Sequence, residues 1–116
     1  GAAGALGMLD LPLRGRRRRP LDGGSRTDEA GARALLPELI GWSLVGDALE
    51  RRFAFDDFHR TMAFVNAVAW IAHEQDHHPE LSVGYGQCTL RFSTHSVGGL
   101  SINDFICAAK VDALLP

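Results

Sequence analysis

Four of the five histidines of this chain lie between residues 73 and 95. They are His73, His77, His78 and His95, and three of them belong to the motifs Asp76-His77-His78-Pro79 and Ser93-Thr94-His95. Histidine is the side chain whose unperturbed pKa falls nearest neutrality, so a cluster of imidazoles suits either proton transfer or metal binding. The sequence therefore predicts a chemical site in this window, and two kinds of chemistry have to be weighed.

A metal site is one interpretation of the cluster. His73 and His77 are four residues apart and would share one face of a helix. His95 or Asp104 could then be a third ligand. The stretch 73–77 has the bare spacing of two histidines with a glutamate between them, but His77 falls where the helix is expected to end. Neither cysteine belongs to a ligand motif, so the pattern specifies a metal only loosely.

Proton transfer is the second interpretation. Imidazoles crowded into one site repel one another's positive charge, which keeps some of them neutral near pH 7. One ring can then donate a proton to a leaving oxygen while another accepts one. Asp76 and Asp104 could orient or polarise these rings, and no serine or cysteine nucleophile is needed. A third interpretation takes His77 and His78 as ordinary exposed turn residues, which is less attractive for four clustered histidines.

A helix and a strand must position these histidines. Asp56 or Asp57 is expected to cap a helix that runs to about Gln75, because apolar residues recur there at helical spacing. Those residues are Phe58, Met62, Val65, Ala69 and Ala72, with Phe64, Val68 and Ile71 widening the apolar face. Pro79 prevents easy continuation and pushes the residue before it toward extended geometry. We expect this helix to be the central one of the core.

Alternation of side chains over residues 88–94 predicts the strand that ends at His95, so both histidine groups are expected to border one cleft. The other expected elements are strands at 42–45, 50–55 and 81–85, a first helix capped by Thr27 and a last helix capped by Ser101. Their order is αββαββα. This order predicts a single α+β domain, with a four-stranded antiparallel sheet and three helices packed on one face.

Charge divides the chain near residue 26. Residues 1–26 hold six arginines against two aspartates, a balance of +4, whereas residues 27–116 hold six basic and twelve acidic residues, a balance of −6. The first segment lacks apolar periodicity and is predicted to be a disordered basic extension, before a folded domain at 27–116. A nucleic-acid or lipid-binding arm, a transit-like leader and a dispensable extension all fit it, and we prefer the last. The acidic domain argues against binding of a nucleic-acid backbone.

Composition is typical of a soluble globular protein, with 46% hydrophobic and 22% charged residues. No apolar run approaches the roughly 18 residues of a membrane-spanning helix, so no membrane association is expected. Cys88 and Cys107 have no CxxC partner and no spacing that suggests a disulfide framework. They are predicted to be buried thiols in a reducing, cytoplasmic compartment.

Residues 33–116 resemble the pterin-4a-carbinolamine dehydratase family. The family pattern is an acidic residue or His, three residues, His-His-Pro, an aromatic residue, Thr-His, Gly-Gly-Leu and Asp. The matching positions are His73, His77-His78-Pro79, Tyr85, Thr94-His95, Gly98-Gly99-Leu100 and Asp104, with Gly41-Trp42 and Phe53-Ala54-Phe55 upstream. His-His-Pro alone is weak, but the combined pattern is specific. Many relatives carry Glu at the position of His73, so this residue is a departure.

The resemblance implies a hydro-lyase that converts 4a-hydroxytetrahydropterin (pterin-4a-carbinolamine) to quinonoid dihydropterin. Its catalytic residues would be His77, His78 and His95. The residues around the substrate would be Trp42, His73, Pro79, Tyr85, Ser93, Thr94 and Asp104. The family uses no metal and no cofactor, because the pterin is itself the substrate, and this lowers the weight of the metal interpretation.

The resemblance also implies partners. Family members form homodimers or homotetramers and recycle tetrahydrobiopterin for aromatic amino acid hydroxylases. Animal relatives also act as dimerisation cofactors for a homeodomain transcription factor, so a binding module is the alternative function. That role would use an exposed apolar helix face, for which residues 104–114 are the candidate. A zinc hydrolase is third.

Overall fold

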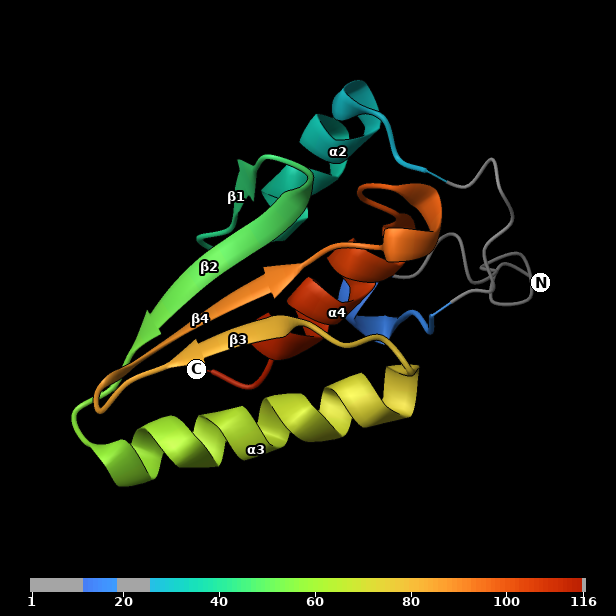
Figure 1. The fold of residues 1–116 in the computed structure, drawn as a ribbon. Helices are drawn as coiled ribbons and strands as arrows, with labels where there is room; N and C mark the ends of the chain where they lie inside the picture. The colour runs from blue at the N-terminus through green and yellow to red at the C-terminus, as the bar shows by residue number, and fades with distance from the viewer. Residues whose placement is uncertain (1–11, 19–25, 116) are drawn as a thin grey trace.

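The computed structural model describes residues 12–18 and 26–115. Its sheet contains β1 (Ser43–Val45), β2 (Ala48–Ala54), β3 (Glu80–Val83) and β4 (Gln87–Phe92). The α-helices are α2 (Glu29–Leu35), α3 (Phe58–Gln75) and α4 (Ile102–Asp112), and the short 3-10 helices are η2 (Leu13–Gly15), η3 (Leu36–Glu38) and η4 (His95–Val97). The predicted αββαββα order is confirmed (Figure 1).

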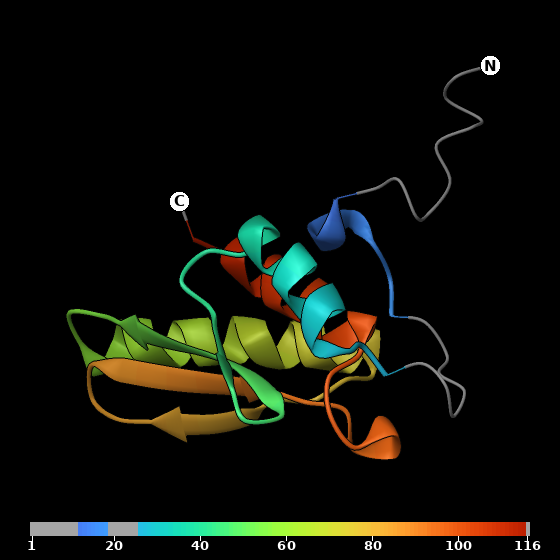
Figure 2. The same cartoon turned by 90° about the horizontal axis from the view of Figure 1, so that it is seen from above.

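All strand pairs of the sheet are antiparallel, in the order β1-β2-β4-β3. Along β4 every second side chain is buried, and in β2 the buried Leu49 and Phe53 lie opposite Phe92 and Cys88 of β4. This alternation gives the sheet one apolar face, which must be covered. The helices lie together on that side of the sheet, as expected for the predicted α+β class (Figure 2).

The central helix of the core is α4, so the expectation that the long helix α3 holds this place was wrong. Every residue of α4 from Asn103 to Ala109 is buried, because the helix packs against the sheet, α3 and η2 at once. In α3 the buried residues are Thr61, Phe64, Val68, Ile71, Ala72 and Gln75. Phe58 is half exposed and Ala69 is exposed, so the core-facing stripe runs through the residues that were predicted to widen the apolar face, together with Ala72.

Helix caps set where the elements begin. Asp57 caps α3 by accepting the backbone N–H of Arg60 at 2.7 Å, which confirms one of the two predicted caps. Ser101 caps α4, also as predicted. The cap of α2 is Asp28, not Thr27, because the Asp28 carboxylate accepts the Gly31 N–H at 2.7 Å.

Residues 12–18 differ from the disordered extension that the sequence predicts. Leu13 is 1% exposed within the hydrophobic core, and η2 packs on α4. Burial of Leu13 stabilises the packing of this segment in spite of the arginines around it. A prediction from composition does not detect a single buried residue. The rest of the predicted extension, residues 1–11 and 19–25, lies outside the described residues. Within the described part, no helix is long and apolar enough to span a membrane.

Candidate active site

His77 enters the core through the turn that ends α3. Asp76 adopts a left-handed conformation, with φ 48° and ψ 46°, and its N–H bonds to His73 O. The next N–H, that of His77, reaches back to Ala72 O at 3.1 Å. This pair of bonds is a Schellman ending, which reverses the chain direction. It directs the His77 side chain inward, where the ring is 9% exposed and stacks on Phe92 with the ring centroids 6.1 Å apart.

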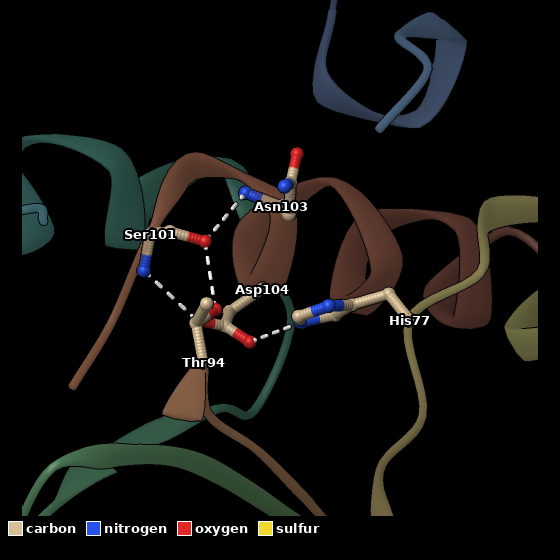
Figure 3. Close-up of polar contacts among 5 residues, drawn as sticks. All are labelled: His77, Thr94, Ser101, Asn103 and Asp104. Carbon is tan, nitrogen blue, oxygen red and sulfur yellow. Dashed lines mark hydrogen bonds and ion pairs between the residues drawn. The ribbon is translucent and has the colours of Figure 1, made fainter. Parts of the chain in front are cut away.

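Asp104 meets His77 from the first turn of α4. Its Oδ1 lies 2.6 Å from His77 Nε2, and its Oδ2 accepts the Thr94 hydroxyl at 2.8 Å and the Ser101 backbone N–H at 2.9 Å (Figure 3). The bond to Ser101 completes a capping box, so the start of the helix itself fixes the carboxylate. Asp104 is fully buried, and a buried carboxylate requires such partners.

The directions of these hydrogen bonds follow from counting protons. An ionised carboxylate only accepts, so His77 must donate from Nε2 and Thr94 must donate its single hydroxyl proton to Asp104. The hydroxyl of Ser101, 2.8 Å from Thr94 Oγ1, is then the donor to Thr94. Ser101 Oγ in turn accepts the Asn103 N–H at 3.3 Å. This network leaves Nδ1 as the one ring nitrogen of His77 that can exchange a proton with a substrate.

His78 and His95 each follow a member of this network in the sequence. His78 follows His77 directly, and His95 follows Thr94 at the start of η4, so the bonds to Asp104 bring both segments together. The side chains of His78 and His95 are exposed, whereas Pro79 and Ser93 are partly buried. The structure therefore joins an inner histidine to two outer ones. His73 is exposed on α3, where its ring lies 5.7 Å from that of Trp70.

Tyr85 lies at the opposite end of α3 from the histidines. It sits in the turn between β3 and β4, is 69% exposed, and stacks on Phe58, the first residue of the helix. An 18-residue helix is about 27 Å long at about 1.5 Å per residue, so Tyr85 cannot reach His77 within one chain. The structure does not bring this predicted substrate-binding residue into the histidine site.

Trp42 belongs to a second polar cluster. Its indole N–H donates to Asp112 Oδ1 at 2.7 Å, and Arg51 donates to the same oxygen at 2.7 Å. The Trp42 ring is buried and lies 5.9 Å from the ring of Phe92, which also stacks on His77. Trp42 thus packs near Phe92, which stacks on His77, but its indole N–H bonds to Asp112 and not to the histidine site.

The sequence predicts Ser101 as a helix cap but does not mark it as a site residue. The signal that could have found it is the spacing Ser101-Ile-Asn-Asp104, a capping box in which the helix cap and the carboxylate bond to each other. Because Asp104 was already a candidate, its capping partner follows from this spacing. The hydroxyl chain through Thr94 required the fold.

Metal ligation and thiol chemistry find little support in the described structure. Within residues 12–18 and 26–115, no three His, Cys, Asp or Glu side chains are grouped so that they could hold a metal ion. Both cysteines are buried and free. Burial, and then the nearby Asp104 carboxylate, raises the pKa of the Cys107 thiol to about 12. Burial also raises the pKa of Cys88, so both thiols stay protonated near neutral pH.

Fold and site together define an α+β domain that holds a buried histidine–aspartate pair, with exposed His78 and His95 next in sequence to His77 and Thr94 of its network. The chain belongs to the family described as pterin 4 alpha carbinolamine dehydratase, whose model matches residues 25–114. The resemblance seen in the sequence is thereby confirmed.

Relatives at high identity cover most of the chain. A protein of Stenotrophomonas maltophilia is 56% identical over 111 residues, which cover 92% of this chain and 96% of that protein. A protein of Nitrosomonas eutropha is 51% identical over 107 residues, covering 89% and 93%. Both carry the name pterin-4-alpha-carbinolamine dehydratase as a provisional assignment.

Two solved structures share the fold. The first is described as a transcriptional coactivator/pterin dehydratase from Brucella melitensis, with a TM-score of 0.75 and 32% identity, covering 78% of this chain and 99% of that one. The second is a pterin dehydratase-like protein described as a RuBisCO assembly factor in the alpha-carboxysome, with a TM-score of 0.56 and 29% identity. It covers 65% of this chain and 89% of that one.

Proposed function

We propose that this protein is a hydro-lyase that dehydrates pterin-4a-carbinolamine to quinonoid dihydropterin by acid–base catalysis with His77, His78 and His95. The observation that carries the proposal is the bond between His77 Nε2 and buried Asp104. The exposed histidines His78 and His95 directly follow His77 and Thr94, the two residues that bond to Asp104. Membership of the family gives the substrate class. The arrangement suits a small molecule that needs one proton delivered and another removed.

The reaction itself sets these two demands. The C4a–O bond breaks with its electron pair on oxygen, and a proton on that oxygen lets it leave as water. The N5–H bond gives up its proton, and its electron pair forms the N5=C4a double bond. No oxidant or reductant is involved, so a redox cofactor has no required part in this balance.

Roles for the three histidines follow from their surroundings. His77 is held by Asp104 through Nε2, so its proton exchange with substrate takes place at Nδ1. We assign His77 or His78 as the acid toward the 4a-hydroxyl and His95 as its acid–base counterpart. The pterin would rest against Pro79, with Ser93, Thr94 and Asp104 holding the opposite wall. The assignment concerns the group of three histidines rather than fixed single steps.

The direct test uses the purified protein in chelator-treated buffer at pH 7. Positioned acid–base groups contribute about 10²–10⁴-fold, so carbinolamine should disappear at least about 10²-fold faster than without protein. His95→Ala should lower this rate by about tenfold or more, since an outer acid–base partner is removed. His59→Ala is the matched control, because His59 is exposed on α3 outside the site. A rate equal to the uncatalysed one, or one that appears only with added zinc, would refute the proposal.

A binding module is the second candidate, because the Brucella neighbour is described as both a transcriptional coactivator and a pterin dehydratase. The surface predicted for it, residues 104–114, is not available in the single chain, since most of α4 is buried. A specific partner captured by an inactive wild-type protein would favour this candidate. The proposed pathway role, recycling of tetrahydrobiopterin for an aromatic amino acid hydroxylase in the cytoplasm, depends on turnover being found.

We also propose that the protein is a homodimer or homotetramer. All four residues of the edge strand β3 are exposed, and Leu81 and Val83 remain 43% and 41% exposed there. An edge strand with free backbone groups and apolar side chains is a template for pairing with a second copy. Light scattering after gel filtration should give a multiple of 12.6 kDa.

The oligomer proposal has a matched pair of variants. Val83→Lys should shift the mass toward the monomer, because a charge on the edge strand opposes pairing. Leu114→Lys should not, because Leu114 has the same 41% exposure but follows α4 and lies outside the sheet. A monomeric wild-type protein would contradict the proposal.

A further inference from the structure

Residues 12–18, here called the strap, run from α4, on which η2 packs, to the last residue of α3. Leu13 anchors the strap, because it is 1% exposed in the core beside α4. Lys110 of α4 donates from Nζ to Arg14 O at 2.8 Å. An apolar anchor and a hydrogen bond to the same helix fix the path of the strap over α4.

The strap then bonds to the helix that delivers the histidines. The Arg18 backbone N–H donates to Gln75 Oε1 at 2.8 Å. Gln75 is the last residue of α3, it is 9% exposed, and the Schellman turn to His77 begins immediately after it. The contact uses the Arg18 backbone, so it does not depend on the arginine side chain.

Residues 26 and 27 contact the segment that follows His95. The Thr27 N–H donates to Leu100 O at 2.8 Å, and a Cβ added at Gly99 would lie 2.9 Å from Arg26 Nε. Gly99 pairs with Thr94 in an isolated bridge, which closes the loop that carries His95. Residues 12–18 and 26–27 therefore touch both segments that the Asp104 network joins.

We propose that the strap and Gln75 are a positioning element of the histidine site. The Arg18 N–H holds Gln75, and Gln75 holds the last turn of α3 from which His77 and His78 leave. A displacement of about 1 Å in a catalytic group is enough to slow a reaction strongly. If the turn after α3 is held less firmly, we therefore expect the reaction to slow while the protein still binds substrate. The kinetic part of this proposal rests on the dehydratase function proposed above, whereas the structural part does not.

The strap lies outside the domain that defines the family, since the family model begins at residue 25. The segment nevertheless falls within the match to one relative. An alignment that covers 92% of the 116 residues leaves about nine outside, so the Stenotrophomonas match includes residues 12–18 wherever it begins. The strap therefore lies outside the range of the family model but inside the match to this relative.

The test removes one N–H from the full chain. Arg18→Pro deletes the donor to Gln75, whereas Arg18→Ala keeps it and removes only the side chain. Arg17→Pro is a second control, because it stiffens the strap one residue earlier and keeps the Arg18 N–H. A proline at position 17 is also compatible with the fold, because the residue before a proline prefers an extended backbone and Arg16 already has one. Arg18→Pro should lower kcat about three- to tenfold with KM within about twofold, and both controls should match wild type.

Gln75→Met should have the same effect as Arg18→Pro, because it removes the acceptor at similar volume. The double variant should lose no more than either single one, since both break the same bond. Wild-type kcat in Arg18→Pro, or losses that multiply in the double variant, would overturn the proposal. A similar kcat loss in Arg17→Pro would also overturn it, because general stiffening would then be the cause.

A readout independent of activity separates this proposal from the function. The amides of Asp76 and His77 are bonded to His73 O and Ala72 O, so their hydrogen exchange reports whether the turn is held. Exchange at both should be about three- to tenfold faster in Arg18→Pro and unchanged in Arg18→Ala. Unchanged exchange in Arg18→Pro sinks the strap proposal even if the enzyme is active. Faster exchange in a protein without turnover sinks the function alone.

Discussion

Replacement of His77 by Gln should lower kcat for carbinolamine dehydration at pH 7 by about 10²–10⁴-fold, the usual contribution of a positioned acid–base group. The Gln amide can still donate to Asp104 and so keeps the buried carboxylate paired. It cannot exchange a proton at the position of Nδ1. The fold should therefore survive while the chemistry is lost, and stopped-flow absorbance of the carbinolamine measures the rate.

His77→Ala is the harsher companion variant. It should lose at least as much activity as His77→Gln and also lose stability, because Asp104 is then left buried without one of its donors. Circular dichroism and thermal unfolding distinguish the two effects. His59→Ala, on the exposed side of α3, should leave both rate and stability unchanged. Near wild-type turnover in a folded His77→Gln protein would exclude His77 from the proton-transfer steps.

Local patterns predicted the elements around the site well. The alternation over residues 88–94 and the helical spacing before Gln75 gave β4 and α3 nearly to the residue. The sequence predicts Ser101 as a cap and offers Asp57 as one of two caps, because a side-chain oxygen two or three residues before an orphan N–H is a local signal. The motif around His77 and the Thr-His pair marked the two segments that Asp104 joins.

Tertiary packing decided what the sequence could not. The wide apolar face of α3 predicts a central helix. How deeply a helix is buried depends, however, on how many elements cover it, and α4 is covered by η2, α3 and β2. Leu13 sits in a basic stretch and gives no periodic signal, so its place in the core follows only from the fold. Tyr85 matched the family pattern, yet the β3–β4 turn lies at the far end of α3 from His77.

Asp104→Asn should lower kcat by about 10²–10⁴-fold while leaving the fold intact, because it reverses the tautomer of His77. The amide oxygen is best used toward Thr94 and Ser101, which both can only donate here. The amide N–H₂ then faces His77 Nε2, and that nitrogen must accept. The ring proton moves to Nδ1, and a neutral ring can give up that proton only by becoming an anion, so Nδ1 no longer passes a proton to or from the substrate.

Asp112→Asn is the matched control for this change. Asp112 is likewise a buried carboxylate with three donors, namely Trp42, Arg51 and the Ile40 N–H, but it lies in the other polar cluster. Its replacement should lower the melting temperature and leave kcat within about twofold, since it does not contact His77. Nitrogen-15 shifts of the His77 ring should show protonated Nδ1 in Asp104→Asn and protonated Nε2 in Asp112→Asn. Wild-type kcat with a reversed tautomer would mean that Asp104 serves only as a helix cap.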